Sequence, residues 1–346
     1  MPNLKIIGKT IESYEIKQEQ FKIDINELEK SNEKTLEDIY KTKTNEKFSE
    51  YAKNILNNLY NNKYNSKKTV RKTSLLIKTP TPKILIPVFP GTNCELDIKY
   101  MFEKHGGKCE IFIITNLNEY NIEESITNFS KKINSANIIA IPGGFSAADE
   151  PDGSAKFIAS FFRNCKVKEA THKFLKEKDG LMLGICNGFQ ALIKLGLIEH
   201  GVITNPKEVS ATLTYNSIGK HKSDIVQTKV ISNKSVWLQY ENLECQYKIA
   251  ISHGEGRLIA KDETLQKFIQ NDQIASVYVD FNNKISMDSA FNPNGSYLAI
   301  EGLTSKDGKI FGRMGHSERM QENLYKNIPN IKYQNIFKAG VDYFKA

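Results

Sequence analysis

The sequence lacks any segment that could cross a membrane. Its longest apolar runs, residues 84–90 and 138–142, are far shorter than the roughly 18 residues needed to span a bilayer. The N-terminus mixes polar and charged residues and has no apolar stretch ending in small residues, which a secretory leader requires. We therefore expect a cytoplasmic protein that has no membrane anchor.

Cysteine is scarce, and the usual metal and nucleotide motifs are missing. The five cysteines are an odd number and include no C-x-x-C pair, which argues against a disulfide framework and against a cysteine-rich zinc site. The zinc-peptidase motif H-E-x-x-H is absent, as are the phosphate-binding patterns G-x-x-x-x-G-K-[ST] and G-x-G-x-x-G. The sequence therefore predicts no metal site in this chain and no binding of ATP or a dinucleotide by it.

Acidic residues are missing from one basic segment. Residues 51–82 contain seven Lys or Arg and no Asp or Glu. Residues 1–82 together carry 16 basic and 11 acidic residues, so +5 of the net charge of +8 lies there and the rest of the chain is nearly neutral. A basic run could contact nucleic acid, but this composition is more typical of a solvated linker. We expect a linker and no nucleic-acid partner.

Length and composition indicate a folded protein of about two domains. The chain has 346 residues, of which 40% are hydrophobic and 25% charged, close to the globular average. Two closely spaced prolines in the sequence TPTP at residues 79–82 favour extended backbone and mark a break in composition. We therefore divide the chain into a small segment at 1–50, the basic linker at 51–82 and a main domain at 83–346.

The main domain has the pattern of an α/β fold. Short apolar runs rich in β-branched residues predict buried strands, and helix-like segments lie between them. The predicted strands are 83–89, 109–115, 137–141 and 180–185, and the helical segments are 94–104, 121–133 and 152–177. This alternation predicts a mostly parallel sheet flanked by helices. After about residue 210 shorter strand-like pieces follow, and the sequence NPNG at residues 292–295 is the clearest turn.

The sequence GICNG at residues 184–188 follows a predicted strand, where ligands of such sheets bind. It has the G-x-nucleophile-x-G form of a strand-to-helix elbow, with Cys186 in the place of a serine. The glycines are needed because side chains two residues before and after the nucleophile would collide in so tight a turn. The helix predicted behind the elbow favours the thiolate. The alternative is a buried structural cysteine in an ordinary turn.

The sequence GHSER at residues 315–319 offers a base for this nucleophile. His316 and Glu318 are two residues apart, and in an extended segment such positions face the same side. Glu318 could then orient His316 and stabilise its charge. An isolated H-x-E pattern would be taken for a solvated surface loop. Combined with the cysteine elbow, it predicts a catalytic triad.

Three further features lie near strand ends or in glycine-rich sequence. The PGG sequence at residues 142–144 exposes backbone N–H groups that suit an oxyanion hole, although an ordinary glycine turn would look the same. His253 lies in SHGEGR at residues 252–257, a setting that suits backbone recognition of a polar substrate better than a second catalytic histidine. Cys94 competes with Cys186 for the role of nucleophile but lacks the flanking glycines, so we rank it below.

Taken in order, these motifs resemble those of the class I (triad) glutamine amidotransferases, most closely the amidotransferase domain of phosphoribosylformylglycinamidine synthase, an enzyme of purine biosynthesis. The resemblance covers roughly residues 83–343. It rests on PVFPGTNC at 87–94, PGGFS at 142–146, GICNGFQ at 184–190, SHGEGR at 252–257, NPNGS at 292–296 and GHSER at 315–319. Residues 147–157 are most similar to the large, single-chain bacterial form. The resemblance implies a flavodoxin-like α/β fold that carries an N-terminal extension.

The resemblance also implies roles for the site residues. Cys186 would be the nucleophile, His316 the base and Glu318 the residue that orients the base. The backbone N–H groups of Gly144 and Asn187 would form the oxyanion hole. The glutamine would be held by Gln190, Ser252, His253, Gly254 and Glu255.

The implied reaction is hydrolysis of L-glutamine to glutamate and ammonia through a cysteine thioester. The ammonia would pass to a synthetase half, in cis or as a separate chain, which converts formylglycinamide ribonucleotide to formylglycinamidine ribonucleotide. ATP and Mg²⁺ are expected only on that half. Residues 1–50 of this chain weakly resemble the tail of that half. Ser317 stands where many amidotransferases have proline, which loosens the backbone but keeps the catalytic side chains. The alternatives are another amidotransferase or a cysteine peptidase-like enzyme of this fold, and a non-catalytic regulatory module.

Overall fold

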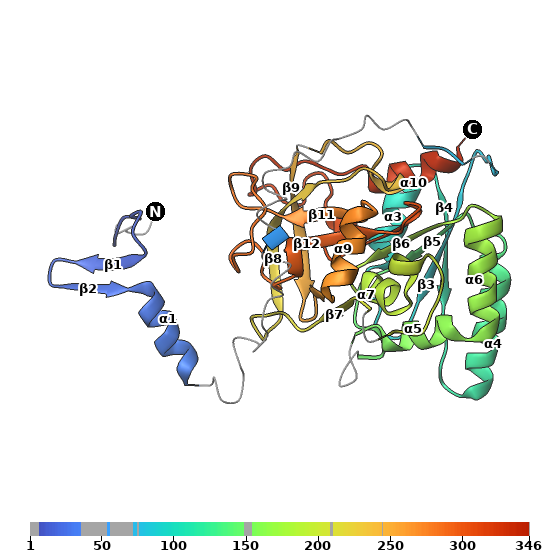
Figure 1. Ribbon diagram of the computed structural model, residues 1–346, viewed down its shortest axis with the longest axis horizontal. Coiled ribbons are helices and arrows are strands. Elements are labelled where there is room, and N and C mark those ends of the chain that lie inside the picture. The colour runs from blue at the N-terminus through green and yellow to red at the C-terminus, as the bar shows by residue number, and fades with distance from the viewer. Residues whose placement is uncertain are drawn as a thin grey trace, which may run out of the picture.

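The computed structural model describes residues 7–35, 54–55, 72–74, 76–148, 154–207, 210–243 and 245–345. In the first of these ranges, β1 (Glu15–Gln18) and β2 (Phe21–Asp24) pair as an antiparallel hairpin that α1 (Ile25–Lys34) follows. Figure 1 shows this small unit apart from the main body. The predicted segment at 1–50 lies only partly within the described residues, and most of the predicted linker at 51–82 lies outside them.

A nine-stranded sheet forms the centre of the main domain, in the order β4-β3-β5-β6-β13-β12-β11-β8-β9. Its first five strands run parallel: β4 (Lys108–Ile113), β3 (Lys83–Val88), β5 (Ile138–Ile141), β6 (Leu181–Ile185) and β13 (Ile310–Arg313). This is the flavodoxin-like strand order, and it confirms the predicted parallel sheet. Every residue of β5 and β6 is buried, as expected of parallel strands that helices cover on both faces.

The other half of the sheet is antiparallel. Its strands are β12 (Ile300–Thr304), β11 (Ile274–Tyr278), β8 (Lys222–Val230) and β9 (Gln246–His253), and β7 (Thr212–Thr214) and β10 (Arg257–Ile259) form a separate ribbon. β13 is the seam of the sheet, because it pairs in parallel with β6 and antiparallel with β12. The strand-like pieces predicted after residue 210 thus extend one continuous sheet. The predicted turn closes with a hydrogen bond of 3.0 Å from the Gly295 N–H to the Asn292 carbonyl.

Helices cover both faces of the parallel half (Figure 1). The helices described in the main domain are α3 (Glu95–Lys104), α4 (Glu119–Ile133), α5 (Lys156–Arg163), α6 (Cys165–Glu177), α7 (Asn187–Lys194), α8 (Leu197–His200), α9 (Asp262–Gln270) and α10 (Ile336–Phe344), with 3₁₀ turns η1 (Ser146–Ala148), η2 (Val236–Leu238), η3 (Tyr297–Ala299) and η4 (Ser317–Arg319). The connection from β3 to β4 crosses the sheet in the opposite direction to that from β4 to β5. Right-handed crossovers therefore place α3 and α4 on opposite faces. Phe102 of α3 packs on Phe337 of α10, and Phe129 of α4 on Phe161 of α5, with ring centroids 5.0 and 5.5 Å apart.

The chain that precedes β3 packs against the C-terminal helix α10. The backbone N–H of Ser74 donates to the Tyr343 carbonyl at 2.7 Å, and that of Thr79 donates to the Phe344 carbonyl at 2.9 Å. The described residues between 72 and 79 therefore lie on the main domain, although they belong to the segment predicted as a linker.

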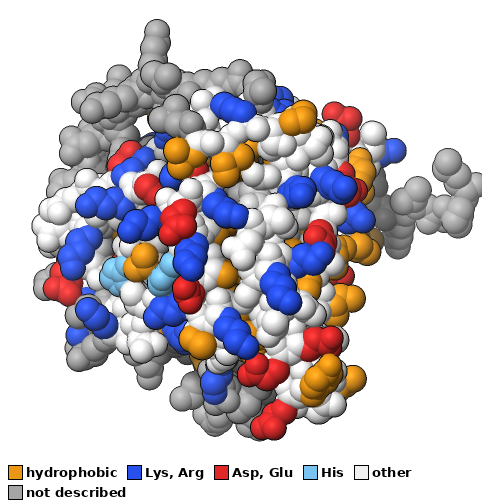
Figure 2. Space-filling view, turned by 90° about the vertical axis from the view of Figure 1, so that its right-hand side faces the viewer, with side chains coloured by type: hydrophobic (Ala, Val, Ile, Leu, Met, Phe, Trp, Pro, Cys, Tyr) orange, Lys and Arg blue, Asp and Glu red, His pale blue; other side chains and the backbone are white. Residues whose placement is uncertain are grey.

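Every helix in the described part of the chain is too short or too polar to cross a bilayer. The face formed by α4 and α6 carries basic and acidic side chains interspersed (Figure 2). Several of them pair: Lys132 with Glu110 at 2.7 Å, Lys166 with Glu123 at 3.6 Å and Lys173 with Glu169 at 2.9 Å. Mixed charge of this kind is typical of a solvated helical face.

Candidate active site

Cys186 lies on a sharp turn between β6 and α7. Its backbone has φ 52° and ψ −106°, a conformation that non-glycine residues rarely adopt and that costs on the order of 1–3 kcal/mol. A Cβ on Gly188 would lie 2.0 Å from the Ile141 carbonyl oxygen, and one on Gly184 would lie 2.6 Å from the Gly188 carbonyl oxygen. The structure therefore has the tight elbow that the sequence predicts, with both glycines required by contacts to backbone.

His316 reaches Cys186 because their strands are parallel neighbours. β6 ends at Ile185 beside Arg313, the last residue of β13, so the segment that follows β13 runs alongside the elbow. The N–H of Cys186 donates to the Arg313 carbonyl at 2.8 Å. The N–H of His316 donates to the Ala250 carbonyl of β9, also at 2.8 Å. Two hydrogen bonds to neighbouring strands thus fix the backbones of the thiol and the imidazole.

Glu318 contacts His316 as predicted, but through a different backbone. The Nδ1 of His316 and the Oε1 of Glu318 are 2.6 Å apart. The prediction of an extended segment was wrong, because residues 317–319 form the 3₁₀ turn η4 and His316 caps it. The turn folds the Glu318 side chain back onto the imidazole. A carboxylate can only accept, so Nδ1 carries the proton and Nε2 is left for chemistry.

The electrostatics of this pair favour a charged imidazole. Burial of His316 acts to lower its pKa, because a charged group is poorly solvated there. The negative charge of Glu318 and the hydrogen bond to the Cys186 thiol outweigh burial and hold the pKa of His316 well above its ordinary value. His316 can therefore accept a proton from the thiol and keep it at neutral pH.

The glycine loop after β5 lies against the elbow. A Cβ on Gly143 would lie 2.9 Å from Cε1 of His316 and 3.3 Å from Cβ of Cys186. Gly144 has φ +140° and no room for a side chain, because a Cβ would lie 2.6 Å from the Gly91 carbonyl oxygen. The bridge that holds this loop uses the Gly143 carbonyl and the Phe145 N–H, so the Gly144 N–H stays out of that pairing. The arrangement suits the predicted oxyanion hole.

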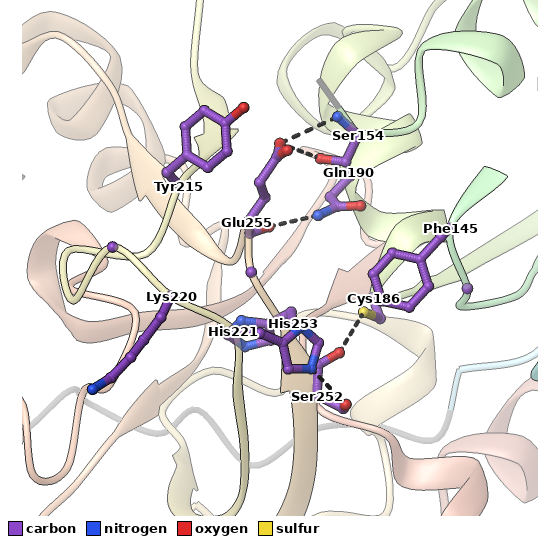
Figure 3. Close-up of a pocket in the computed structure, with 13 residues that line it drawn as sticks. Phe145, Ser154, Cys186, Gln190, Tyr215, Lys220, His221, Ser252, His253 and Glu255 are labelled. Atoms are coloured by element: carbon purple, nitrogen blue, oxygen red, sulfur yellow. Dashed lines mark hydrogen bonds between the residues drawn. The ribbon is translucent and has the colours of Figure 1, made fainter. Parts of the chain in front are cut away.

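A cavity of about 250 Å³ opens beside Cys186, large enough for an amino acid (Figure 3). Its lining comprises Gly144, Phe145, Ser154, Cys186, Gln190, Tyr215, Gly219, Lys220, His221, Ser252, His253, Gly254 and Glu255. The structure thus brings together all the residues predicted to hold the substrate. The carbonyl of Ser252 lies 3.7 Å from the Cys186 sulfur, so residues 252–256, which we call the substrate loop, lie directly beside the thiol.

Gln190 and Glu255 join the walls of this cavity. The amide nitrogen of Gln190 donates to the Glu255 carbonyl at 2.5 Å, and its oxygen accepts from the Asn187 side chain at 2.9 Å. The Glu255 carboxylate accepts from both the N–H and the hydroxyl of Ser154, at 3.2 and 2.6 Å. The helix behind the nucleophile is thereby connected to the substrate loop (Figure 3).

His253 is buried and neutral. Its Nδ1 lies 3.2 Å from the oxygen of Asn216, and that oxygen also accepts from the Gly256 N–H at 3.0 Å. Burial is the main reason that the pKa of His253 falls to about 3. A neutral, buried ring that contacts Asn216 helps to fix the backbone of residues 252–256.

Comparison with known protein families shows to which family the chain belongs. The family model described as "CobB/CobQ-like glutamine amidotransferase domain" matches residues 81–344, well over half of the sequence. The chain belongs to this glutamine amidotransferase family. The match begins two residues before β3 and ends with α10, so it covers the main domain and not the N-terminal unit.

Curated relatives of this amidotransferase share most of their length with it. The "Phosphoribosylformylglycinamidine synthase subunit PurQ" of Methanococcus maripaludis strain C7 is 32% identical over 284 residues, which cover 76% of this chain and 97% of the relative. The protein of the same name from Campylobacter jejuni is 31% identical over 250 residues, 72% of this chain and 93% of the relative. The solved "Structure of PurLQS from Thermotoga maritima" contains a chain with the same fold, with a TM-score of 0.53, 24% identity, and coverage of 76% of this chain and 97% of that one.

Cys94 also lies beside the imidazole of this amidotransferase. Its sulfur is 3.9 Å from Nδ1 of His316 and accepts a hydrogen bond of 3.2 Å from Nη2 of Arg319. The donor atoms of Cys94, His316 and Glu318 lie within 4.8 Å of one another and are of the types that zinc uses. The Nδ1 proton, however, is committed to Glu318, and a guanidinium cation contacts the sulfur. We therefore interpret the cluster as a hydrogen-bond network.

Replacement of Cys94 by alanine is expected to lower glutaminase kcat by less than about tenfold. Glu318 holds Nδ1 much more closely than Cys94 does, and Arg319 keeps its 3.4 Å ion pair with Asp97. The thermal midpoint should fall slightly, because a small buried group is lost. Steady-state glutamate release and a melting curve measure both effects. A loss comparable to that of a Cys186 variant would transfer the role of nucleophile to Cys94.

The sequence missed several residues of the cavity. Tyr215, Lys220 and His221 come from the loop before β8. Asn216 in the same loop ties it to the 252–256 segment, because its side chain donates to the His253 carbonyl and accepts from the Gly256 N–H. No local motif marks these residues. They reach the site only because β8 pairs with β9 and places its preceding loop beside the end of β9.

Proposed function

We propose that this chain is the glutaminase of a phosphoribosylformylglycinamidine synthase, in which Cys186, His316 and Glu318 are the catalytic residues. The observation that carries the proposal is the joint placement of a strained cysteine elbow, a carboxylate-bound imidazole and a cavity the size of an amino acid. The family membership and the names of the curated relatives support the reaction and the pathway.

In the first half-reaction, the Cys186 sulfur attacks the side-chain amide carbon of glutamine. The N–H groups of Gly144 and Asn187 would bind the oxygen of the tetrahedral intermediate, at about 3 kcal/mol for each donor. The C–N bond then breaks as Nε2 of His316 gives its proton to the nitrogen, and ammonia leaves. A γ-glutamyl thioester on Cys186 remains.

In the second half-reaction, His316 accepts a proton from a water molecule that attacks the thioester carbon. The C–S bond breaks, glutamate is released and the thiolate of Cys186 is restored. Glu318 stays ionised throughout and holds the Nδ1–H of the imidazole, which stabilises the imidazolium that forms in each half-reaction.

The cavity offers charge of both signs to the substrate. Glu255, Lys220 and His221 are among the residues that line it. Free glutamine is a zwitterion, so an ammonium and a carboxylate group must be accommodated at the end remote from the amide. We propose that these residues and the Ser252–Glu255 loop orient that end, while Gln190 keeps the loop in place.

We propose that the released ammonia is used by a separate or attached synthetase half, which forms formylglycinamidine ribonucleotide. The names of the relatives, a PurQ subunit and a PurLQS assembly, support such a partner. ATP and Mg²⁺ would act on the synthetase half, and the enzyme would work in the cytoplasm.

The proposal is tested by incubating the full chain and its synthetase with glutamine, ATP and formylglycinamide ribonucleotide. We expect stoichiometric glutamate and amidine, with no cleavage of peptides. Mass spectrometry after treatment with a glutamine-mimicking electrophile should show one adduct on Cys186. Peptide cleavage in the absence of glutamate release would indicate a peptidase, and an unlabelled Cys186 would indicate a non-catalytic module.

The chain alone is expected to be a poor glutaminase. Free hydrolysis wastes ammonia, so the site gains from completing its oxyanion hole only when the acceptor is loaded. The means is a change in the backbone at Gly144, because its positive φ is a conformation that glycine adopts without strain and leaves readily.

We expect the loaded synthetase to raise glutaminase kcat on the order of tenfold or more, a usual size for coupling between sites. The measurement compares the chain by itself with the chain plus synthetase, ATP and formylglycinamide ribonucleotide. Equal rates in the two mixtures would rule out the coupling.

A further inference from the structure

A fully buried ion pair lies beside the segment that carries the imidazole. Glu301 of β12 and Arg313 of β13 are both completely buried. Their contact is bidentate, with Nε to Oε1 at 2.9 Å and Nη2 to Oε2 at 2.8 Å, and the Ser276 hydroxyl also donates to the carboxylate at 2.5 Å. A buried pair of this kind adds little net stability, because desolvation offsets the attraction. The ion pair is therefore better explained by a role in positioning neighbouring residues than by stability.

The two partners contact the residues on either side of His316. The Glu301 carboxylate accepts from the Gly315 N–H at 2.8 Å, and Nη1 of Arg313 donates to the Ser317 hydroxyl at 2.9 Å. The backbone before and after the imidazole is therefore attached to one rigid unit. Proline at position 317 could not accept this hydrogen bond. The serine, expected from the sequence to loosen the backbone, is instead a point of attachment.

Arg313 also holds the other half of the catalytic pair. Its carbonyl oxygen accepts the hydrogen bond from the N–H of Cys186. One residue thus contacts the backbone of the nucleophile through its carbonyl and the neighbour of the base through its guanidinium. Displacement of reacting groups by about 1 Å can cost on the order of 100-fold in rate.

We infer that Arg313, Glu301 and Ser317 are positioning residues that set the imidazole of His316 against the sulfur of Cys186. The inference rests on the proposed function, because it assigns to this unit the alignment that glutamine hydrolysis requires. The unit does not contact the cavity, so its effect is on the rate of the chemical step and not on the binding of glutamine.

Ser317→Ala in the full chain, assayed with its synthetase, tests this directly. The variant removes only a buried hydroxyl, and we expect kcat to fall about 10- to 100-fold, as for a hydrogen bond to a charged group. KM should stay within about threefold, and alkylation of Cys186 by a glutamine-mimicking electrophile should slow in parallel. Ser235→Ala is the matched control, since its buried hydroxyl donates to the Gly308 carbonyl at 3.0 Å outside the site. The control should keep kcat.

Arg313→Lys adds a double-mutant cycle. Lysine keeps the charge opposite Glu301 and the carbonyl to Cys186, but it cannot also reach Ser317 in the same geometry. If Ser317 acts through Arg313, the double variant should be no slower than Arg313→Lys alone.

If the losses in kcat of the two single variants instead multiply in the double variant, the inference is overturned. It is also overturned by Ser317→Ala with a wild-type kcat, or with a raised KM alone. If Arg313→Lys does not fold, the comparison of Ser317→Ala with Ser235→Ala decides. Failure of the wild-type mixture to release glutamate would refute the proposed function instead.

Discussion

Replacement of Cys186 by alanine is expected to reduce glutamine hydrolysis by at least about 10⁴-fold while the protein stays folded. The thiol forms the covalent bond to substrate, and the other described cysteine near the imidazole, Cys94, cannot replace it because its sulfur lies on the Nδ1 side of the ring and outside the lining of the cavity. Alanine tolerates the backbone at φ 52° no worse than cysteine does, so the elbow should persist.

Glutamate release by the chain with its synthetase measures this loss, and the thermal midpoint reports the fold. The matched control is Cys165→Ala, which changes an exposed cysteine on α6 and should keep full activity. Activity of the Cys186 variant above about 1% of wild type would remove Cys186 from the role of nucleophile.

Alanine at His316 should come close to the loss seen for Cys186, whereas Glu318→Gln should lose about 10- to 100-fold less. The imidazole transfers protons in both half-reactions. Glu318 only orients it and balances its charge, and a glutamine amide oxygen can still accept from Nδ1. The charge that raises the pKa of His316 would nevertheless be gone, so the imidazolium should form less readily.

Initial rates with saturating glutamine distinguish the two variants, and alkylation of Cys186 reports how readily the thiolate forms in each. His200→Ala, on the exposed end of α8, is the control. Small and equal losses at His316 and Glu318 would mean that the GHSER segment takes no part in the chemistry.

The fold of the parallel half could be predicted because its strands carry their own signal. Runs such as IIAI in β5 are apolar at every position since both faces are covered, and turn residues bound each run. The single long helix predicted over 152–177 is two helices. Asn164 ends α5 with φ −53° and ψ 137°, and its side chain then accepts from the Lys166 N–H to begin α6. A cap inside a continuous helical pattern is hard to recognise from composition.

Some features of the site could likewise be predicted from the sequence, and others could not. The elbow was predictable because its constraint is local: glycines within two residues of Cys186 avoid backbone atoms of the same turn and the adjacent strand. The contact of His316 with Glu318 was predicted, but its 3₁₀ geometry was not, because a three-residue turn capped by His316 has no distinctive sequence pattern. The attachment of Ser317 to Arg313 and the approach of the loop before β8 depend on strand pairing across the seam, which no local pattern reports.

The position of β13 at the seam has a consequence for how the enzyme matures during synthesis. During synthesis the elbow leaves the ribosome well before β13 and His316, which follows it, because the elements from β7 to β12 are made in between. Until β13 inserts, β6 has an unpaired edge, whose free N–H and C=O groups can pair with strands of other chains. Insertion of β13 beside β6 requires contacts between residues far apart in sequence, and such contacts form slowly. The nascent chain therefore holds its thiol without a base to activate it. Insertion of β13 both covers the exposed edge of β6 and brings His316 to Cys186. A chain that has not finished folding is therefore expected not to hydrolyse glutamine.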